Sequence, residues 1–324
     1  MKALLCDDAD LNELRVQEVA DPLPGPRQVL LDIRAASVDF VDTLVMRGIY
    51  QIPVPRPFVP GNNVAGVVVE VGDACTRFSV GDRVHGLAFV GGFAERIAIS
   101  EDKLRPTPDA LPFDLACLAG VPYRTAYDAI VSKGSLREGE DLVVLGASGG
   151  VGSAAILIGK ALGARVIACA STADKLQFCR DIGADEVVSY TEPGFKDALK
   201  AVCPQGADVV LDMVGGDITE PALRATGYGG RFVIVGFAAG GPARVPMNLV
   251  LLKGSSIIGY EIADFENREP VQAAQNRDAL EELLASGRIT PPITGRFTLD
   301  DAADAVRLVA GRDKLGTTII EGIS

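Results

Sequence analysis

The stretch 142–168, LVVLGASGGVGSAAILIGKALGARVIA, sets the architecture expected for the middle of the chain. Leu142–Leu145 predicts a buried strand, a glycine-rich turn follows it, and Val151–Leu162 predicts a helix that starts with small residues. The pattern G-x-G-x-x-A is formed by Gly150, Gly152 and Ala155. Such glycines allow a tight turn and a close approach of backbone N–H groups to a pyrophosphate, which the helix N-terminus also attracts. The stretch therefore predicts a dinucleotide-binding turn.

Strand and helix patterns continue to alternate after this turn. Further apolar strands are expected at Arg165–Ala170, Glu186–Ser189, Asp208–Asp212 and Gly230–Val235. Helices are expected at Thr172–Asp181, Phe195–Val202 and Ile218–Ala225. This alternation is typical of a doubly wound parallel sheet, the Rossmann α/β fold, whose strands are apolar because helices cover both faces.

The first 120 residues have a different texture, with short strand patterns broken by Gly, Pro and Asp. The expected strands are Gln28–Arg34, Gly66–Val71, Arg83–Phe89 and Phe93–Ser100, with one helix at Phe40–Met46. Many short strands with little helix favour a β-barrel. Beyond the Rossmann pattern, helices are expected at Glu269–Ser286 and Leu299–Val309, and a last strand at Gly316–Ile320.

The end of the second Rossmann strand indicates which dinucleotide is preferred. An NAD site usually places an acid about 20 residues after the glycines, where it binds the ribose hydroxyls. This chain has Ala170, Ser171 and Thr172 there, and Lys175 can reach a 2′-phosphate. NADPH is therefore favoured over NADH. In the alternative interpretation Ser171 or Thr172 only caps the next helix, Asp174 completes a capping box, and Lys175 is solvated.

Metal ligands are scarce in the sequence. His85 is its single histidine, and the six cysteines are scattered without a C-x-x-C pair. His85 is expected to be a partly buried hydrogen-bonding residue, and neither a catalytic nor a structural zinc is expected. The scattered cysteines indicate free thiols in a reducing compartment.

Charge and hydropathy limit the partners. The net charge of −12 disfavours nucleic acid and anionic lipid surfaces. No apolar run approaches the roughly 20 residues of a membrane span, and the N-terminus MKALLCDDADLNE does not resemble a signal peptide. The expected location is the cytoplasm, with neither nucleic acid nor membrane as a partner.

Several motifs are familiar as a set. They include ASVDFVDTLVMRGIYQ (36–51), PFVPGNNVAGVVVEVG (57–72), VGDRVHGL (80–87), LGASGGVG (145–152) and GGRFVIVGFAAG (229–240). Together they make the whole chain resemble the zinc-free quinone oxidoreductase branch of the medium-chain dehydrogenase/reductase superfamily, the group that contains zeta-crystallin. The resemblance implies a GroES-like β-barrel domain formed by residues 1–120 and 265–324, a Rossmann domain at 121–264, an active site in the cleft between them, and a homodimer.

The resemblance also implies a cofactor shell around NADPH. The pyrophosphate would be met by Ser148, Gly149, Gly150 and Val151. The adenosine ribose phosphate would be met by Ser171, Thr172, Lys175 and Tyr190. The nicotinamide side would be lined by Thr125, Gly236 and Phe237. Tyr190 can equally be an ordinary aromatic residue at a strand end.

Three positions depart from the family pattern. Asp39 stands where relatives commonly have Asn, Asn62-Asn63 stand where a glutamate is frequent, and Arg124 stands where Gly is usual. All three are expected near the cleft and put the substrate preference in question. Asp39 can alternatively be an exposed N-cap of the Phe40–Met46 helix.

The expected reaction is hydride transfer from NADPH to a quinone or a conjugated enone. A conjugated acceptor needs little acid catalysis, so positioning and water exclusion are the main tasks of the protein. Tyr50 is the first candidate for orienting the acceptor oxygen or supplying a proton, and Asp39 is the second; Tyr50 can also be a packing aromatic. The alternatives are an enoyl-thioester reductase, which Arg124 and Lys253 keep open, and a non-catalytic NADPH-binding sensor, which the changes at Asp39 and Asn63 favour.

Overall fold

The computed structural model describes residues 1–311 and 313–323, which form two compact units. Unit 1 comprises Met1–Val121 together with the described chain from Ile293 onward, and unit 2 is Pro122–Pro292. Each unit has its own core of fully buried aliphatic and aromatic side chains. The chain therefore leaves unit 1, builds unit 2 and returns to complete unit 1.

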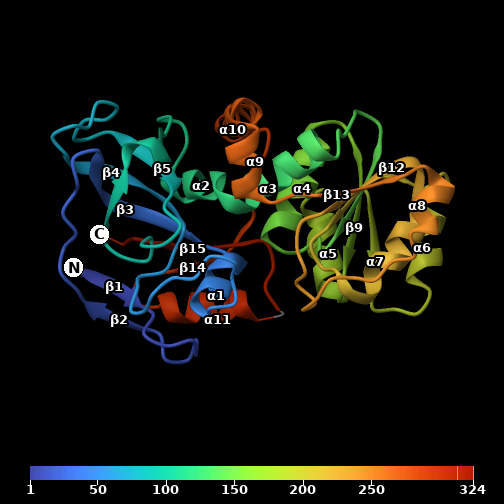
Figure 1. Cartoon of the computed structure of the whole chain (residues 1–324), viewed down its shortest axis with the longest axis horizontal. Helices are drawn as coiled ribbons and strands as arrows, with labels where there is room; N and C mark the ends of the chain where they lie inside the picture. The colour runs from blue at the N-terminus through green and yellow to red at the C-terminus, as the bar shows by residue number, and fades with distance from the viewer. Residues whose placement is uncertain (312, 324) are drawn as a thin grey trace. The chain divides into compact units, whose positions relative to one another are not determined.

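Unit 1 is built on a mostly antiparallel sheet of short strands (Figure 1). Its strand order is β14-β15-β3-β4-β5-β7, and β6 pairs with β3. The strands are β3 (Gln28–Val38), β4 (Asn63–Val71), β5 (Arg83–Leu87), β6 (Arg96–Ser100), β7 (Leu104–Pro106), β14 (Ile293–Phe297) and β15 (Thr317–Glu321). A separate pair is formed by β1 (Lys2–Leu5) and β2 (Arg15–Glu18). Strand β15 lies antiparallel to β3, with Thr318 opposite Val38, so the C-terminal segment is part of the sheet.

The helices of unit 1 are short. They are α1 (Phe40–Met46), α2 (Phe113–Ala116) and α11 (Ala302–Ala310), with 3₁₀ turns η1 (Glu101–Lys103) and η2 (Cys117–Ala119). Helix α1 has the bounds predicted from the sequence. It starts directly after β3, and this junction places Asp39 between a buried strand and a helix.

Unit 2 is a six-stranded parallel sheet in the order β10-β9-β8-β11-β12-β13 (Figure 1). The strands are β8 (Asp141–Leu145), β9 (Arg165–Ala170), β10 (Glu186–Ser189), β11 (Ala207–Asp212), β12 (Thr226–Ile234) and β13 (Ser256–Gly259). The chain moves outward from β8 to β10 and then crosses back to β11, so the order reverses between β8 and β11. This confirms the predicted doubly wound sheet, in which ligands bind at the carboxyl ends of the strands near the reversal.

Helices and turns connect the strands of unit 2. They are α3 (Val121–Tyr127), the π-helical segment η3 (Asp128–Lys133), α4 (Gly150–Ala161), α5 (Ala173–Asp181), α6 (Phe195–Val202), η4 (Gly216–Ile218), α7 (Thr219–Ala225), α8 (Asn248–Lys253), α9 (Ile262–Arg268) and α10 (Pro270–Ala285). No helix among the described residues is long and apolar enough to cross a membrane.

The second domain boundary differs from the prediction. Residues 265–292, assigned above to the GroES-like domain, lie in unit 2, and the chain re-enters unit 1 at Ile293. Polar contacts explain this, because Asn276 on α10 donates to Asp128 at 2.6 Å and Lys133 pairs with Glu269 at 2.5 Å. The buried residues of α10 are Ala273, Asn276, Leu280, Leu283 and Leu284, and the sequence pattern alone does not reveal which domain they cover.

Candidate active site

The glycine turn between β8 and α4 packs so closely that the helix start tolerates no side chain at Gly152. A Cβ on Gly152 would lie 2.4 Å from the carbonyl oxygen of Gly146, and Gly146 itself has a φ of +79°. Gly149 is the N-cap of α4 and offers no side chain to the first helical N–H groups. These N–H groups and the positive end of the helix dipole can therefore bind a pyrophosphate. Of the predicted residues, Ser148 and Gly149 lie in this turn, and Gly150 and Val151 are the first residues of α4.

The end of β9 gathers three polar side chains. The Lys175 ammonium lies 3.2 Å from the Ser171 hydroxyl. Burial raises the pKa of Tyr190, and the neighbouring Ser171 side chain opposes the rise. The Tyr190 ring meets Phe195 edge to face at 6.4 Å. The structure thus brings Ser171, Lys175 and Tyr190 together at the strand end.

Thr172 has a separate task beside this group. Its hydroxyl accepts the N–H of Lys175 at 3.4 Å and caps α5. The predicted capping box with Asp174 is wrong, because Asp174 is the second residue of the helix and Lys175 occupies the third position that such a box requires. The capping and ligand-binding interpretations therefore apply to different side chains.

The three residues predicted on the nicotinamide side lie apart in the sequence of unit 2. Thr125 is buried on α3, and Gly236 and Phe237 follow β12. The Phe237 side chain is 47% exposed, and its ring would be 2.9 Å from a Cβ on Gly215. Gly236 and Phe237 therefore lie beside the turn that follows β11.

Asp212 organises that turn, and the sequence analysis missed this role. One of its carboxylate oxygens accepts the N–H groups of Val214 and Gly215, each at 2.9 Å, and the other accepts the Thr219 hydroxyl at 2.6 Å. An acid that ends an apolar strand and precedes Val-Gly-Gly is the signal that could have found it. Asp212 fixes the loop against which Phe237 packs.

In unit 1 the two departures Asp39 and Asn63 contact each other. The Asn63 amide donates to Oδ2 of Asp39 at 2.6 Å, and the Ser37 hydroxyl donates to the same oxygen at 2.8 Å. The Asn63 carbonyl accepts the N–H of Val121 at 3.2 Å. The Asp39 carboxylate is therefore held by the Asn63 amide, so two of the departures are joined by one hydrogen bond.

Asp39 lies at the N-cap position of α1 but is not exposed. Its side chain is buried, and the Asp42 carboxylate accepts the Asp39 N–H at 2.7 Å. The exposed N-cap alternative is thus wrong, since Ser37 and Asn63 hold the carboxylate inward.

Burial governs the charge of this acidic pair. It raises the pKa of Asp39, although Lys314 and the two donors oppose the rise. It raises the pKa of Asp42 further, because the Asp39 carboxylate adds to the effect. Lys314, half-buried before β15, is a member of this group that sequence reasoning did not find. Its own pKa is lowered by burial, and the nearby acids oppose that change.

Tyr50 lies in the loop after α1 and packs against Phe89. Their ring centroids are 6.1 Å apart and the planes are tilted by 41°. Both side chains are partly buried against the core of unit 1.

Arg124, the third departure, has a partner within unit 2. Its guanidinium lies 3.2 Å from Glu266, which Arg277 also contacts at 2.5 Å. The Lys253 ammonium donates to the carbonyl of Thr226. Both cations proposed for a thioester are therefore engaged by the protein itself.

His85 and the cysteines behave as ordinary buried groups. The His85 ring hydrogen-bonds the Thr107 hydroxyl at 2.9 Å. Burial raises the pKa of Cys117, Cys169 and Cys179. Within residues 1–311 and 313–323, no three His, Cys, Asp or Glu side chains are placed together to hold a metal ion.

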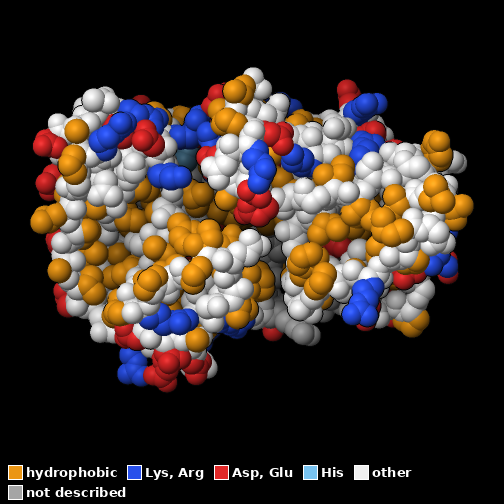
Figure 2. All heavy atoms as spheres, in the orientation of Figure 1, with side chains coloured by type: hydrophobic (Ala, Val, Ile, Leu, Met, Phe, Trp, Pro, Cys, Tyr) orange, Lys and Arg blue, Asp and Glu red, His pale blue; other side chains and the backbone are white. Residues whose placement is uncertain are grey.

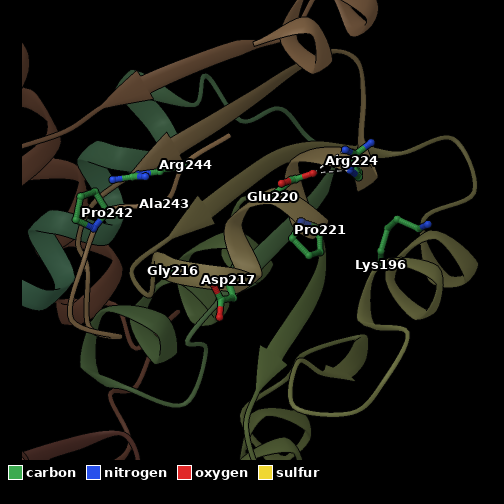
Figure 3. Close-up of a pocket in the computed structure, with 9 residues that line it drawn as sticks. All are labelled: Lys196, Gly216, Asp217, Glu220, Pro221, Arg224, Pro242, Ala243 and Arg244. Carbon is green, nitrogen blue, oxygen red and sulfur yellow. Dashed lines mark hydrogen bonds and ion pairs between the residues drawn. The ribbon is translucent and has the colours of Figure 1, made fainter. Parts of the chain in front are cut away.

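A cavity of about 650 Å³ opens on another part of unit 2 (Figure 3). Pro221 and the Glu220–Arg224 ion pair lie in its middle, with Lys196 on one side and Arg244 on the other. The remaining lining residues are Gly216, Asp217, Pro242 and Ala243. None of the predicted site residues lines this cavity.

Comparison with known proteins agrees with this architecture. The alcohol dehydrogenase GroES-like domain profile matches residues 25–109, and the zinc-binding dehydrogenase profile matches residues 150–276. Quinone oxidoreductase-like protein 2 of Bos taurus is 35% identical over 323 residues, which cover 98% of this chain and 92% of the relative. Quinone oxidoreductase of Homo sapiens is 31% identical over 306 residues, which cover 94% and 92%.

Solved structures show the same likeness. A probable oxidoreductase from Mycobacterium abscessus superposes with a TM-score of 0.90 at 33% identity, covering 99% of this chain and 98% of that one. The Escherichia coli quinone oxidoreductase, solved in complex with NADPH, has a TM-score of 0.90 at 25% identity, covering 99% and 100%. The chain is a member of the quinone oxidoreductase branch of the medium-chain dehydrogenase/reductase superfamily, an oxidoreductase with a GroES-like and a Rossmann domain.

Proposed function

We propose that this oxidoreductase uses NADPH to reduce a quinone or an α,β-unsaturated carbonyl compound without zinc. The observation that carries the proposal is the group Ser171, Lys175 and Tyr190 at the end of β9, where an NAD site would place a carboxylate. The names of the relatives and the NADPH complex of the Escherichia coli enzyme support it.

The described residues fit this cofactor. The glycine turn and the first residues of α4 would bind the pyrophosphate through Ser148–Val151, where the unpaired N–H groups of the helix start lie. Ser171, Lys175 and Tyr190 would bind the 2′-phosphate, with Thr172 at the same helix start. Thr125, Gly236 and Phe237 would line the nicotinamide side. When bound, NADPH supplies a hydride at C4 of its nicotinamide.

The protein then has to position the acceptor and manage a proton. A quinone or enone is already activated by conjugation, which makes a metal Lewis acid unnecessary. The engagement of His85 by Thr107 supports a zinc-free mechanism. Tyr50 is our first candidate for orienting the acceptor oxygen. Asp39 is the second, because its raised pKa lets the carboxyl hold a proton at higher pH than an ordinary aspartate.

The structure weakens the arguments for the two alternatives. A thioester reductase would need cations for an anionic carrier, but Arg124 and Lys253 are engaged within unit 2. The sensor interpretation was favoured by the changes at Asp39 and Asn63, but these two residues are hydrogen-bonded to each other. We therefore favour the reductase over both.

We also propose a cytoplasmic homodimer. In the described part of the sheet, β13 is an edge strand, and exposed apolar side chains lie near it: Tyr228 is 90%, Leu251 80%, Leu252 73% and Met247 66% exposed. Figure 2 shows hydrophobic side chains along the edge where α8 lies. A second copy related by a two-fold axis would cover this surface. Leu251→Lys with Leu252→Lys should give a monomer in light scattering, whereas Val271→Lys on exposed α10 should not.

The experiment that tests the function is stopped-flow loss of NADPH absorbance. The acceptors are 1,4-benzoquinone, 9,10-phenanthrenequinone, a simple enone and a crotonyl thioester, and NADH serves as the control donor. We expect NADPH-selective reduction of quinones or the enone. In Lys175→Ala, kcat/KM for NADPH should fall about tenfold while that for NADH stays unchanged, since one charge-assisted contact is lost. NADPH binding without turnover of any acceptor would overturn the proposal.

A further inference from the structure

Phe89 occupies a strained three-residue turn after β5. Its φ is +66°, and among the described residues only one other non-glycine residue, Ser135, has a positive φ. The N–H of Val90 donates to the carbonyl of Ala88 at 2.9 Å, which closes the turn around Phe89. This γ-turn geometry is rare, and a bulky aromatic side chain at positive φ costs free energy.

The surrounding backbone imposes the turn. Four N–H groups on its two sides donate to carbonyls of the segment 59–62, at 2.7 to 2.9 Å. The donors belong to Ala88, Gly91, Gly92 and Phe93. A strained conformation persists only where such contacts over-determine it, and such positions concentrate at functional sites.

The turn holds the Phe89 ring against Tyr50. Both rings are only partly buried, so their contact leaves aromatic surface that the core of unit 1 does not cover. Two apolar residues near Tyr50 in the chain are also exposed to solvent: Ile49 is 67% exposed and Ile52 is 50% exposed. A strained turn that ends in a half-exposed ring contributes less to the core than a fully buried phenylalanine would.

The same segment 59–62 connects the turn to the acidic pair. Asn62, which accepts the N–H of Ala88, donates its side-chain amide to Asp42 at 2.9 Å. The next residue, Asn63, binds Asp39. The aromatic pair and the polar group are therefore built on one hydrogen-bonded framework, as expected for an apolar site with a few placed polar groups.

We propose that Phe89 and Tyr50 form the surface that recognises the flat aromatic part of the acceptor, and that Phe89 determines specificity. The preferred substrates would be fused-ring quinones and aryl-substituted enones rather than single-ring or aliphatic acceptors. The inference rests on the proposed reductase function. It assigns to Phe89 a binding role, with no part in proton or hydride transfer.

The test compares 9,10-phenanthrenequinone with 1,4-benzoquinone in Phe89→Leu, which keeps an apolar side chain and removes the ring. We expect kcat/KM for phenanthrenequinone to fall roughly three- to tenfold, the range of one aromatic contact, while that for benzoquinone changes less than about twofold. Phe113→Leu is the matched control, a half-buried ring of unit 1 that lies on Arg83 at 4.1 Å, and should leave the ratio unchanged. An equal fall for both acceptors, or no fall, would overturn the proposal.

A binding measurement separates this inference from the function itself. Equilibrium dialysis of phenanthrenequinone should show weaker binding to Phe89→Leu than to the wild type, whether or not turnover occurs. Binding without turnover in the wild type would contradict the reductase function but would still support the aromatic binding surface. Equal binding by both proteins, or no binding by either, would contradict the proposed aromatic binding surface.

Backbone strain at Phe89 can be tested separately by thermal denaturation. Phe89→Ala and Phe89→Gly both delete the ring, but only glycine adopts a positive φ without cost. We expect a higher Tm for Phe89→Gly than for Phe89→Ala, the reverse of the order at an ordinary loop position. The opposite order would show that the turn is unstrained and would remove strain as a ground for the proposal, which the binding measurement decides.

Discussion

Two buried carboxylates of unit 1, Glu101 and Asp39, have opposite electrostatic surroundings. The Glu101 side chain accepts N–H groups of Thr76 and Arg77 at 2.8 and 2.9 Å, the Cys75 thiol at 3.2 Å and the Arg27 guanidinium at 3.0 Å. These donors, the two backbone groups first, lower its pKa to about 2. Asp39 has two neutral side-chain donors on one oxygen and an acid as neighbour, and burial raises its pKa.

The difference shows that burial alone does not decide the charge of a carboxylate. At Glu101 the hydrogen bonds from backbone and side-chain donors outweigh desolvation, whereas at Asp39 desolvation is the largest cause and Lys314, Ser37 and Asn63 only oppose it. Glu101 is a permanent anion that ties the loop at 75–77 to β6 and its following turn. Asp39 is an acid whose ionisation is costly, which suits a group that handles a proton.

Removal of Glu101 should have the largest effect of the changes considered. Glu101→Ala leaves the N–H groups of Thr76 and Arg77 and the Arg27 guanidinium without their shared acceptor, so we expect the largest fall in Tm. The lowered pKa means that Glu101 stabilises the fold fully above its ordinary pKa near 4.5, and that this contribution is lost as the pH falls toward 2.

Urea titrations between pH 6 and pH 2.5 check this sign. Glu101→Gln should lose less stability on acidification than the wild type. The control is Asp102→Asn, because the neighbouring Asp102 side chain is 62% exposed. This variant should lose as much stability on acidification as the wild type. An equal loss of unfolding free energy between pH 6 and pH 2.5 in Glu101→Gln and the wild type would contradict the role assigned to Glu101.

Asn63→Asp should have the next largest effect. It sets a second carboxylate against Oδ2 of Asp39, where the amide now donates at 2.6 Å, and should cost about 2–4 kcal/mol at pH 7. Adding Asp39→Asn restores one amide and one carboxylate with their places exchanged. We expect a double-mutant cycle, measured by chemical denaturation, to show recovery of about 1–2 kcal/mol. Additive losses would mean that the contact does not couple the two residues.

Asp39→Asn alone should have a smaller effect with a distinct pH dependence. Because folding raises the pKa of Asp39, the folded state holds its proton above the ordinary value of 3.8, and this favours folding at low pH. The contribution falls as the pH rises from 3.8 through the raised value. The variant should therefore show a shallower loss of stability from pH 4 upward, with a change of less than about 1 kcal/mol at pH 4 itself. A steeper loss would reverse the assigned sign.

The smallest effect extends the comparison to hydroxyl groups of unit 2. The buried Tyr123 hydroxyl has no hydrogen-bond partner among the described residues, whereas the Tyr260 hydroxyl donates to Asp128 at 2.9 Å. Tyr123→Phe should stabilise the protein by up to about 1 kcal/mol, since it removes an unsatisfied group. Tyr260→Phe should destabilise it by about 1–2 kcal/mol, because Asp128 loses a donor. Thermal denaturation of the pair checks the contrast.

The sequence predicted those features that depend on short-range pattern. The parallel sheet, the glycine turn and the bounds of α1 follow from periodicity and from residues that are neighbours in the chain. The group at the end of β9 was also expected, because in a doubly wound sheet Ser171 and Tyr190 follow adjacent strands. Site roles built on these residues remain proposals.

Contacts between distant residues could not be predicted in the same way. Asp39 and Asn63 meet because β3 and β4 pair with Ser37 opposite Asn63, and this register is not visible in the sequence. The partner of Arg124 is Glu266 on α9, which also binds Arg277 on α10, and the predicted boundary placed both Glu266 and Arg277 in the other domain. The positive φ of Phe89 depends on hydrogen bonds to residues 59–62, and the local sequence Ala-Phe-Val does not indicate a positive φ.

The pairing of β15 with β3 also constrains the order of assembly. A ribosome releases β3 long before β15, and all of residues 122–292 emerge between them. Unit 2 can close as soon as α10 is complete, whereas residues 35–38 of β3 wait for Thr317–Glu321. During synthesis the N-terminal half is thus the late-maturing half. A nascent chain stalled before residue 317 would expose an apolar strand edge of the kind that chaperones protect.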